Sequence, residues 1–484
     1  MELIKTDIVV VGAGPGGYAA AFYAADLGKK VMLVERDSRL GGVCLNRGCI
    51  PSKALLHATH LLDEVKRSEA RGIAFGKPKL SLVKMRAWKE SIIDQLAQGL
   101  SGLCTRRGVE LINGRGHFED SQTLRIETSD GQKFVNYHKA IIAVGSKPSV
   151  PHAFNLGNKR IMTSTEALEL PDIPARMLVV GGGYIGMELG TVYAQLGSEI
   201  VMVEALDSIL PGVDRDLVRP LAKAAQNAFK EIRFKTKVLE MATSGKQIKV
   251  MMENDGARRE ETYDRVLVSV GRTASYEDLG LENTAVKIGD NGFIVCNSQQ
   301  QTSDPAIYAI GDANGGALLA HRATKEARIA VEVIAGESST FDDVVIPAVV
   351  FTDPEVAWCG LTETEAKARG IAVEIVKFPW GASGRALTLD HAEGVTKLLI
   401  EPETERLLGM GITGHGAGEL IGEGVLAIEM GATVKDLAES VHPHPTLSET
   451  LMEAAEMFYG TATHVYLRKR SQDAVKLAPK AKRA

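Results

Sequence analysis

The sequence contains few cysteines and no long apolar segment. Five of the 484 residues are cysteine, an odd and thinly spread set unlike the disulfide framework of a small secreted domain. Every apolar run is broken by glycine or charge before it reaches the roughly 20 residues that a membrane-spanning helix needs. We therefore expect neither a disulfide-stabilised secreted protein nor membrane insertion.

An excess of positive charge is also missing, and we expect no secretory leader. With 56 basic and 61 acidic residues, the formal net charge is -5, which offers nothing to attract a phosphate backbone. The start, MELIKTDIVVVGAG, leads directly into an apolar strand and a glycine turn, without the apolar region and cleavage site of a signal peptide. We expect a cytoplasmic protein that does not bind nucleic acid.

Two segments share a pattern of strand, glycine turn, helix and second strand. In the first, a strand precedes GAGPGG and the next strand ends at Glu35; in the second, a strand precedes GGGYIG and the next ends at Glu204. The acidic residue follows the first motif glycine by the same interval in both copies. Such units make parallel strands, and a chain of this length exceeds one hydrophobic core. The sequence predicts an α/β fold with two Rossmann-like dinucleotide-binding domains.

The motif glycines have the spacing that a bound pyrophosphate requires. They permit a tight turn, close approach of the backbone to phosphate, and close packing of helix on strand. The spacing alone is a weak signal, because glycine turns also merely connect strands to helices, but the flanking strand and acidic residue make it specific. We expect one dinucleotide at Gly12, Gly14 and Gly17, and another at Gly181, Gly183 and Gly186.

One fixed flavin and one exchangeable nicotinamide are the simplest assignment for two such sites. The residues after the second motif favour NAD over NADP. Glu204 would accept hydrogen bonds from a ribose diol and repel a 2′-phosphate. Ala205 and Leu206 follow it, so no arginine is available there to bind such a phosphate.

Cys44 and Cys49 are close neighbours in the segment GGVCLNRGCIPSKALL. Pro51 suits the first turn of a following helix, so we expect the pair near a helix start. A helix N-terminus and the cations Lys53 and Arg47 would favour the thiolate that disulfide exchange needs. A zinc half-site or two unconnected thiols are the alternatives, although no second cysteine or histidine pair with the spacing of a zinc site follows.

A candidate proton acceptor stands near the C-terminus in HPHPTLSETL. An imidazole oriented by a carboxylate is the usual acceptor for a thiol proton. His442 and His444 are the available imidazoles, and Glu449 is the carboxylate. The alternative is a surface histidine beside an ordinary helix start formed by Thr446 or Ser448 with Glu449.

Together, GAGPGG, GGVCLNRGCIPSK, GGGYIG, IYAIGDA and HPHPTLSE resemble the flavoprotein disulfide reductases, a pyridine nucleotide-disulfide oxidoreductase family, and within them the dihydrolipoyl dehydrogenases. The resemblance runs from about residue 5 to 465. It implies a Cys44–Cys49 redox disulfide, FAD on the first Rossmann unit, NAD on the second, and oxidation of protein-bound dihydrolipoamide with reduction of NAD⁺. It also implies a homodimer that serves the lipoyl domains of 2-oxoacid dehydrogenase or glycine-cleavage complexes.

The resemblance further assigns roles to individual residues. Cys44 is expected to exchange with substrate, and Cys49 to form the thiolate contact with the flavin. His444, held by Glu449, is expected to reach the cysteines from the other subunit, with His442 as a bystander. Lys53 is expected near the flavin, paired with Glu188. The implied FAD contacts are Gly12, Gly14, Gly17, Glu35, Lys53, Gly116, Asp312 and Ala320, and the implied NAD contacts are Gly181, Gly183, Gly186, Glu188, Glu204, Val238 and Gly271.

The resemblance and the shifts in composition divide the chain into four domains and a tail. They are an FAD-binding domain, 1–150; an NAD-binding domain, 151–274; a central domain, 275–345; an α+β interface domain, 346–470; and a basic tail, 471–484. The tail is expected to be solvated, with docking to an acidic partner as the alternative.

Two segments depart from the family pattern, and other functions remain open. Arg47 stands where an apolar residue is more usual, and Lys325–Ala327 stands where an acid followed by glycine is expected. Glutathione-type and coenzyme A disulfide reductases are alternatives, although the former prefer NADP. A mercuric reductase would carry a C-terminal cysteine pair, and no cysteine follows Cys359. A non-enzymatic flavoprotein subunit of a complex is the remaining possibility.

Overall fold

The computed structural model describes residues 3–342 and 344–466, so the predicted tail, 471–484, lies outside the described residues. The chain forms two compact units: Met1–Pro211 with Ala225–Val344, and Gly212–Ala224 with Val345–Ala484. The segment Gly212–Ala224, which we placed in the NAD-binding domain, thus groups with the C-terminal unit. The finer division of the first unit into three domains stays a prediction. No helix of the described part is long and apolar enough to cross a membrane.

The first sheet of the first unit contains the first predicted repeat. Its strands run in the order β3-β2-β1-β6-β5-β4, and β17 pairs with β6. The pairs among β3, β2, β1, β6 and β17 are parallel, whereas β4, β5 and β6 are antiparallel neighbours. The strands are β1 (Leu3–Val11), β2 (Val31–Glu35), β3 (Glu110–Asn113), β4 (Arg115–Asp120), β5 (Thr123–Thr128), β6 (Gly131–Ile142) and β17 (Ile307–Ala309).

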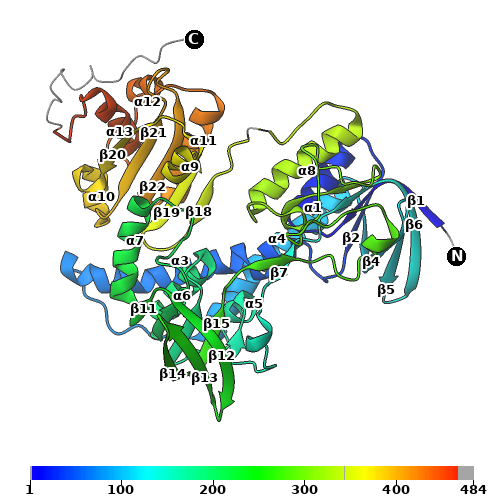
Figure 1. The fold of residues 1–484 in the computed structure, drawn as a ribbon, viewed down its shortest axis with the longest axis horizontal. Helices are drawn as coiled ribbons and strands as arrows, with labels where there is room; N and C mark the ends of the chain where they lie inside the picture. The colour runs from blue at the N-terminus through cyan, green and yellow to red at the C-terminus, as the bar shows by residue number, and fades with distance from the viewer. Residues whose placement is uncertain (1–2, 343, 467–484) are drawn as a thin grey trace. The chain divides into compact units, whose positions relative to one another are not determined.

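Two helices cover one face of this sheet (Figure 1). Helix α1 (Pro15–Asp26) follows the glycine turn, and α8 (Ala320–Ala335) packs beside it. Small side chains allow the close approach: Ala20 and Ala24 of α1 share a buried core with Ala327 and Ala330 of α8. The alanine at position 327, one of the departures noted above, is therefore fully buried in this helix contact.

The second predicted repeat is also present in the first unit. Its parallel sheet has the order β11-β10-β9-β15-β8. Helix α6 (Tyr184–Leu196) follows GGGYIG, as α1 follows GAGPGG. The strands are β8 (Ile161–Met162), β9 (Arg176–Val180), β10 (Glu199–Val203), β11 (Glu231–Arg233) and β15 (Arg265–Val268). The prediction of two Rossmann-like units is confirmed.

Smaller elements complete the first unit. An antiparallel sheet is formed by β12 (Thr236–Ser244), β13 (Gln247–Asn254) and β14 (Ala257–Tyr263). A two-stranded ribbon pairs β7 (Ser146–Pro148) with β16 (Arg272–Ala274). The remaining helices are α2 (Gly42–Arg47), α3 (Cys49–Arg67), α4 (Leu82–Arg106) and α5 (Ser164–Leu168).

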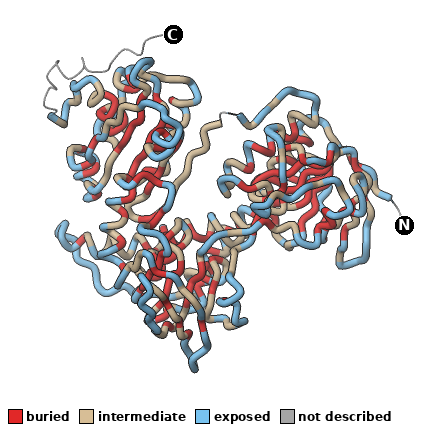
Figure 2. The backbone as a smooth tube through the Cα atoms, viewed as in Figure 1, coloured by how far each residue is buried: buried red, intermediate tan, exposed pale blue. Residues whose placement is uncertain are grey.

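The C-terminal unit is an antiparallel sheet with helices, as the predicted α+β domain requires. Its order is β18-β19-β22-β21-β20, and buried Trp380, Leu398, Ile412 and Ala454 form part of its core. The buried strands stand out in Figure 2. The strands are β18 (Ala348–Val350), β19 (Glu355–Gly360), β20 (Glu374–Pro379), β21 (Val395–Ile400) and β22 (Leu407–Gly414). The helices are α9 (Glu363–Arg369), α10 (Gly384–Leu389), α11 (Ala417–Glu429), α12 (Val434–Glu439) and α13 (Glu449–Tyr459), and α7 (Arg215–Ala228) begins in the segment that joins this unit.

Candidate active site

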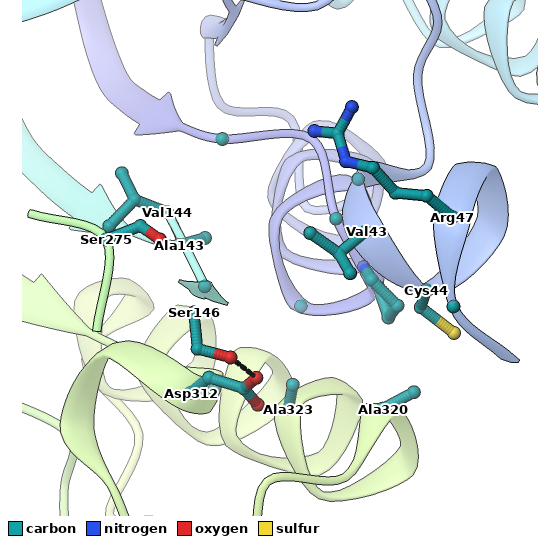
Figure 3. Close-up of a pocket in the computed structure, with 18 of the residues that line it drawn as sticks. Val43, Cys44, Arg47, Ala143, Val144, Ser146, Ser275, Asp312, Ala320 and Ala323 are labelled. Carbon is teal, nitrogen blue, oxygen red and sulfur yellow. Dashed lines mark hydrogen bonds between the residues drawn. The ribbon is translucent and has the colours of Figure 1, made fainter. Parts of the chain in front are cut away.

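One cavity in the first unit gathers most of the predicted flavin-side residues (Figure 3). They come from the first glycine turn, helices α2 and α3, and the turn after β17. Glu188 of α6 also lines this cavity, so the second repeat contributes to it. The predicted residues in its wall are Gly12, Gly14, Glu35, Cys44, Cys49, Lys53, Gly116, Glu188, Asp312 and Ala320.

The glycines of the first turn are required by the backbone. Gly12 has a φ of +100°, which favours glycine. A Cβ on Gly17 would lie 1.8 Å from the Gly12 carbonyl oxygen, so only glycine allows this packing. Gly14 is different, because the nearest atom to its Cβ would be 3.9 Å away. Gly14 therefore leaves the open backbone that a pyrophosphate could approach.

The second turn reproduces this arrangement. Gly181 has a φ of +103°, and a Cβ on Gly186 would lie 2.0 Å from the Gly181 carbonyl oxygen. A Cβ on Gly183 would meet no atom within 4 Å. The two turns thus use glycine for the same two purposes, packing and close approach of a ligand, which fits two dinucleotides.

A buried carboxylate closes each turn at the end of the second strand. Glu35 accepts hydrogen bonds from the Ala13 amide at 2.7 Å and the Asp37 amide at 2.9 Å. Burial raises the pKa of Glu35. Glu204 accepts the equivalent bonds from Gly182 at 2.6 Å and Leu206 at 2.8 Å. Each carboxylate is therefore fixed beside its glycine turn, where the ribose of a dinucleotide would lie.

Cys44 and Cys49 are both free thiols, and their environments differ. Cys44 lies in α2, and Cys49 is the exposed first residue of α3. A hydrogen bond from Cys44 and the charge of Lys53 lower the pKa of Cys49 to about 7. The same hydrogen bond, together with burial, raises the pKa of Cys44. Cys49 is therefore the thiol of the pair that ionises more readily, and Cys44 is the one that keeps its proton.

Lys53 forms the predicted pair with Glu188. Its Nζ lies 3.0 Å from Glu188 Oε1 and 2.9 Å from Oε2, and the glutamate side chain is almost fully buried. Arg47, which we considered as a second cation for the thiolate, instead forms an ion pair with Asp37. Asp37 follows β2 closely in sequence, so its carboxylate draws the guanidinium toward that strand.

The predicted histidine and glutamate meet in the C-terminal unit. His444 Nδ1 lies 2.8 Å from Glu449 Oε1, and the histidine side chain is 72% exposed. The other oxygen of Glu449 accepts from the Thr446 amide at 2.7 Å. Burial opposes ionisation of Glu449, but the Thr446 amide and His444 outweigh it and hold its pKa below the ordinary range. Glu449 is also the first residue of α13, so it both begins the helix and orients the imidazole.

His442 has a different environment from His444. Its Nε2 lies 2.8 Å from Glu423, its Nδ1 lies 2.8 Å from the Ser440 carbonyl, and its side chain is buried. Both ring nitrogens are thus engaged within the unit, and the bystander role of His442 stays a prediction.

Two weaker predictions stay outside the cavity wall. Val238 lies in β12, and Gly271 follows β15 with a φ of +132°. Neither lines the cavity, and their contact with NAD stays a prediction.

Residues of the cavity wall that the sequence did not indicate include Ser146, Tyr184 and Arg272. Ser146 and Arg272 each follow a glycine at the end of a buried strand, and that position was the available signal. Tyr184 lies within the second glycine motif, and its side chain is 42% exposed.

Glu326, in the second segment that departs from the family pattern, supports the cavity from α8. It is fully buried, accepts a 2.6 Å hydrogen bond from the Gly311 amide, and pairs with Arg322 at 2.5 Å. Gly311 precedes Asp312, so this contact helps to place the turn that carries Asp312.

Comparison with known proteins agrees with this geometry. Residues 6–327 match the pyridine nucleotide-disulphide oxidoreductase profile, and residues 346–455 match the dimerisation domain of the same group. The chain therefore belongs to the pyridine nucleotide-disulphide oxidoreductase family. Dihydrolipoyl dehydrogenase from Vibrio cholerae is 45% identical over 95% of this chain and 97% of its own length. The Thermus scotoductus enzyme of the same name is also 45% identical, over 95% and 98%.

Solved structures show the same fold. LpdA from Mycobacterium tuberculosis superposes with a TM-score of 0.87 at 26% identity, covering 94% of this chain and 99% of that one. The HOCl-induced flavoprotein disulfide reductase RclA from Escherichia coli, in a Cu(II) complex, gives a TM-score of 0.84 at 25% identity, covering 94% and 100%.

Proposed function

We propose that this protein oxidises protein-bound dihydrolipoyl groups to lipoyl groups and reduces NAD⁺ to NADH, using FAD and the Cys44–Cys49 pair. The observation that carries the proposal is the asymmetry of the two thiols in a cavity that also contains a dinucleotide-type glycine turn. The sequence similarity to dihydrolipoyl dehydrogenases over nearly the whole chain supports the dithiol substrate.

The residues present fit both cofactors. The turn at Gly12, Gly14 and Gly17, with Glu35, would hold FAD, and the turn at Gly181, Gly183 and Gly186, with Glu204, would hold NAD. When bound, FAD supplies a two-electron carrier between the dithiol and the nicotinamide. The protein contributes binding, orientation and proton transfer.

The cysteines perform the exchange with substrate. A substrate thiolate attacks the Cys44 sulfur of the oxidised pair, the Cys44–Cys49 bond breaks, and Cys49 leaves as a thiolate. The second substrate thiolate then attacks the substrate sulfur of the mixed disulfide and releases Cys44. Two electrons have passed to the protein, the substrate is now a disulfide, and Lys53 stabilises the Cys49 thiolate.

His444 moves the proton in this scheme. Its Nδ1 is held by Glu449, which leaves Nε2 to accept the substrate thiol proton. The dimerisation-domain match supports a homodimer, and we place His444 of the partner subunit at the cysteines of each active site. Lipoyl domains of 2-oxoacid dehydrogenase or glycine-cleavage complexes are the proposed partners, in the cytoplasm.

Steady-state assays with dihydrolipoamide test the proposal. NADH should form, and NADP⁺ should be a poor acceptor because Glu204 repels a 2′-phosphate. Anaerobic two-electron reduction of the holoenzyme should produce a long-wavelength absorbance band that Cys49→Ser abolishes. Oxidation of glutathione or a coenzyme A thiol in preference to dihydrolipoamide would instead assign another disulfide substrate.

A further inference from the structure

Arg272 follows β15, the last strand of the second repeat, and it lines the cavity wall. It is the first residue of β16 and directly follows Gly271. Its side chain is only 10% exposed. Arg272 Nε donates to Ser146 Oγ at 2.7 Å, and Nη2 donates to the Ser146 carbonyl at 2.8 Å. The planar guanidinium thus binds the backbone and the side chain of one residue at once.

Ser146 in turn forms a hydrogen bond with Asp312. Its hydroxyl is buried and donates to Asp312 Oδ2 (Figure 3). Because Arg272 occupies an acceptor position of Ser146 Oγ, the single hydroxyl proton is directed to the carboxylate. Arg272 Nε itself lies 3.9 Å from Asp312 Oδ2, so the guanidinium and the carboxylate flank the same hydroxyl.

Both the backbone and the side chain of Asp312 are held in place. Asp312 follows Gly311. The φ of +68° at Gly311, and the hydrogen bond that its amide donates to Glu326, set the course of the turn. Ser146 then sets the direction of the carboxylate. Ser146, Arg272 and Asp312 all line the cavity that contains the first glycine turn and Cys49.

We propose that Arg272 is a positioning residue that acts through Ser146 to hold the Asp312 carboxylate at the FAD site. The residue that follows the predicted NAD contact Gly271 thereby contributes to FAD retention. The proposal rests on the FAD assignment of the proposed function and is independent of the dithiol substrate.

A double-mutant cycle tests this relay, the chain of contacts from Arg272 through Ser146 to Asp312. Apoprotein of the wild type, Arg272→Gln, Ser146→Ala and the double variant is titrated with FAD, and the Kd is measured from flavin fluorescence. Each single change should raise the Kd about tenfold, since a hydrogen bond to a charged group is lost. The Kd of the double variant should not exceed the higher Kd of the two single variants. Either single change already disrupts the hydrogen bonds that connect Arg272 to Asp312, so the two effects should not add. Additive losses, or an unchanged Kd in either single variant, would overturn the proposal.

Matched variants separate positioning from general destabilisation. Arg265→Gln removes an arginine of similar exposure that pairs with Asp172 outside the cavity, and Ser198→Ala removes a buried hydroxyl elsewhere in the unit. Both should leave the FAD Kd unchanged. Arg272→Lys keeps the charge without the fork and should give an intermediate Kd; a wild-type Kd would also count against the relay.

The apoprotein melting temperature provides the check on folding. If Arg272→Gln does not fold, Ser146→Ala and Arg272→Lys carry the test. Wild-type protein that binds FAD but does not oxidise dihydrolipoamide would refute the proposed substrate. The FAD Kd values would still test the relay independently.

Discussion

Lys53 and Glu188 form a bidentate ion pair, with Nζ 2.9 and 3.0 Å from the two carboxylate oxygens, although they lie 135 residues apart in the sequence. Lys53 is one helical turn after Cys49, and Glu188 belongs to the helix of the second repeat. Their charges act on Cys49 in opposite directions, since Lys53 lowers its pKa and Glu188 raises it. The pair therefore adjusts the pKa of Cys49, which the hydrogen bond from Cys44 lowers most.

Substituting either member of this pair should shift the titration of Cys49. Lys53→Met removes a charge that stabilises the thiolate, so the pKa of Cys49 should rise by about one unit above its value near 7. Glu188→Gln should lower it. The pH dependence of iodoacetamide alkylation of the reduced protein measures both shifts. Lys66→Met, at an exposed position of the same helix, is the control. Two shifts of the same sign would refute this account.

Glu449→Gln should lower kcat about 10- to 100-fold with dihydrolipoamide, because the imidazole loses the carboxylate that orients it. Glu423→Gln is the matched control, since Glu423 holds His442 at the same 2.8 Å distance. It should leave kcat near the wild-type value. Equal losses in the two variants would show that His444 has no special role.

The lowered pKa of Glu449 also predicts a pH dependence of stability. A carboxylate whose folded pKa lies below its unfolded value of about 4.3 stabilises the folded state above that pH. The stabilisation is lost as the pH falls through the folded pKa. The free energy of unfolding of Glu449→Gln should therefore approach that of the wild type in acid. Urea denaturation between about pH 3 and 7 checks this, and a gap that widens in acid would contradict it.

Glu204 should control the choice of nicotinamide. Glu204→Gln removes the charge that repels a 2′-phosphate, so kcat/KM for NADP⁺ should rise and that for NAD⁺ should fall about tenfold. Glu199→Gln changes an exposed carboxylate at the start of β10, the strand that Glu204 directly follows, and should alter neither value. An unchanged ratio of the two kcat/KM values in Glu204→Gln would contradict the assignment.

Alanine substitutions at Gly17 and Gly186 should affect the binding of different cofactors. Gly17→Ala places a Cβ 1.8 Å from a carbonyl oxygen and should destabilise the fold by about 1–3 kcal/mol or more, with loss of FAD. Gly186→Ala makes the equivalent clash in the second turn and should abolish NAD binding while FAD is retained. Flavin absorbance, NADH titration and thermal melting check these outcomes. Gly99→Ala in α4, where a Cβ would meet nothing within 4 Å, should be neutral or slightly stabilising.

Local features of this protein were predictable from the sequence by itself. The glycine turns depend on backbone geometry and on residues within one strand–turn–helix unit, so GAGPGG and GGGYIG, together with the strand before each and the acidic residue after it, were sufficient to locate them. The same holds for Cys49 at a helix start and for Glu449, five residues from His444. In each case the partners are close in the chain, so local backbone geometry brings them together.

Only the tertiary structure decided which distant groups meet. It paired Arg47 with Asp37 rather than with the cysteines, grouped Gly212–Ala224 with the C-terminal unit, and aligned Arg272, Ser146 and Asp312 in one relay. The relay residues come from strand ends and a turn far apart in the sequence, and no periodicity in the sequence links them. Their contacts exist because the packing of the sheets brings those strand ends to the wall of one cavity.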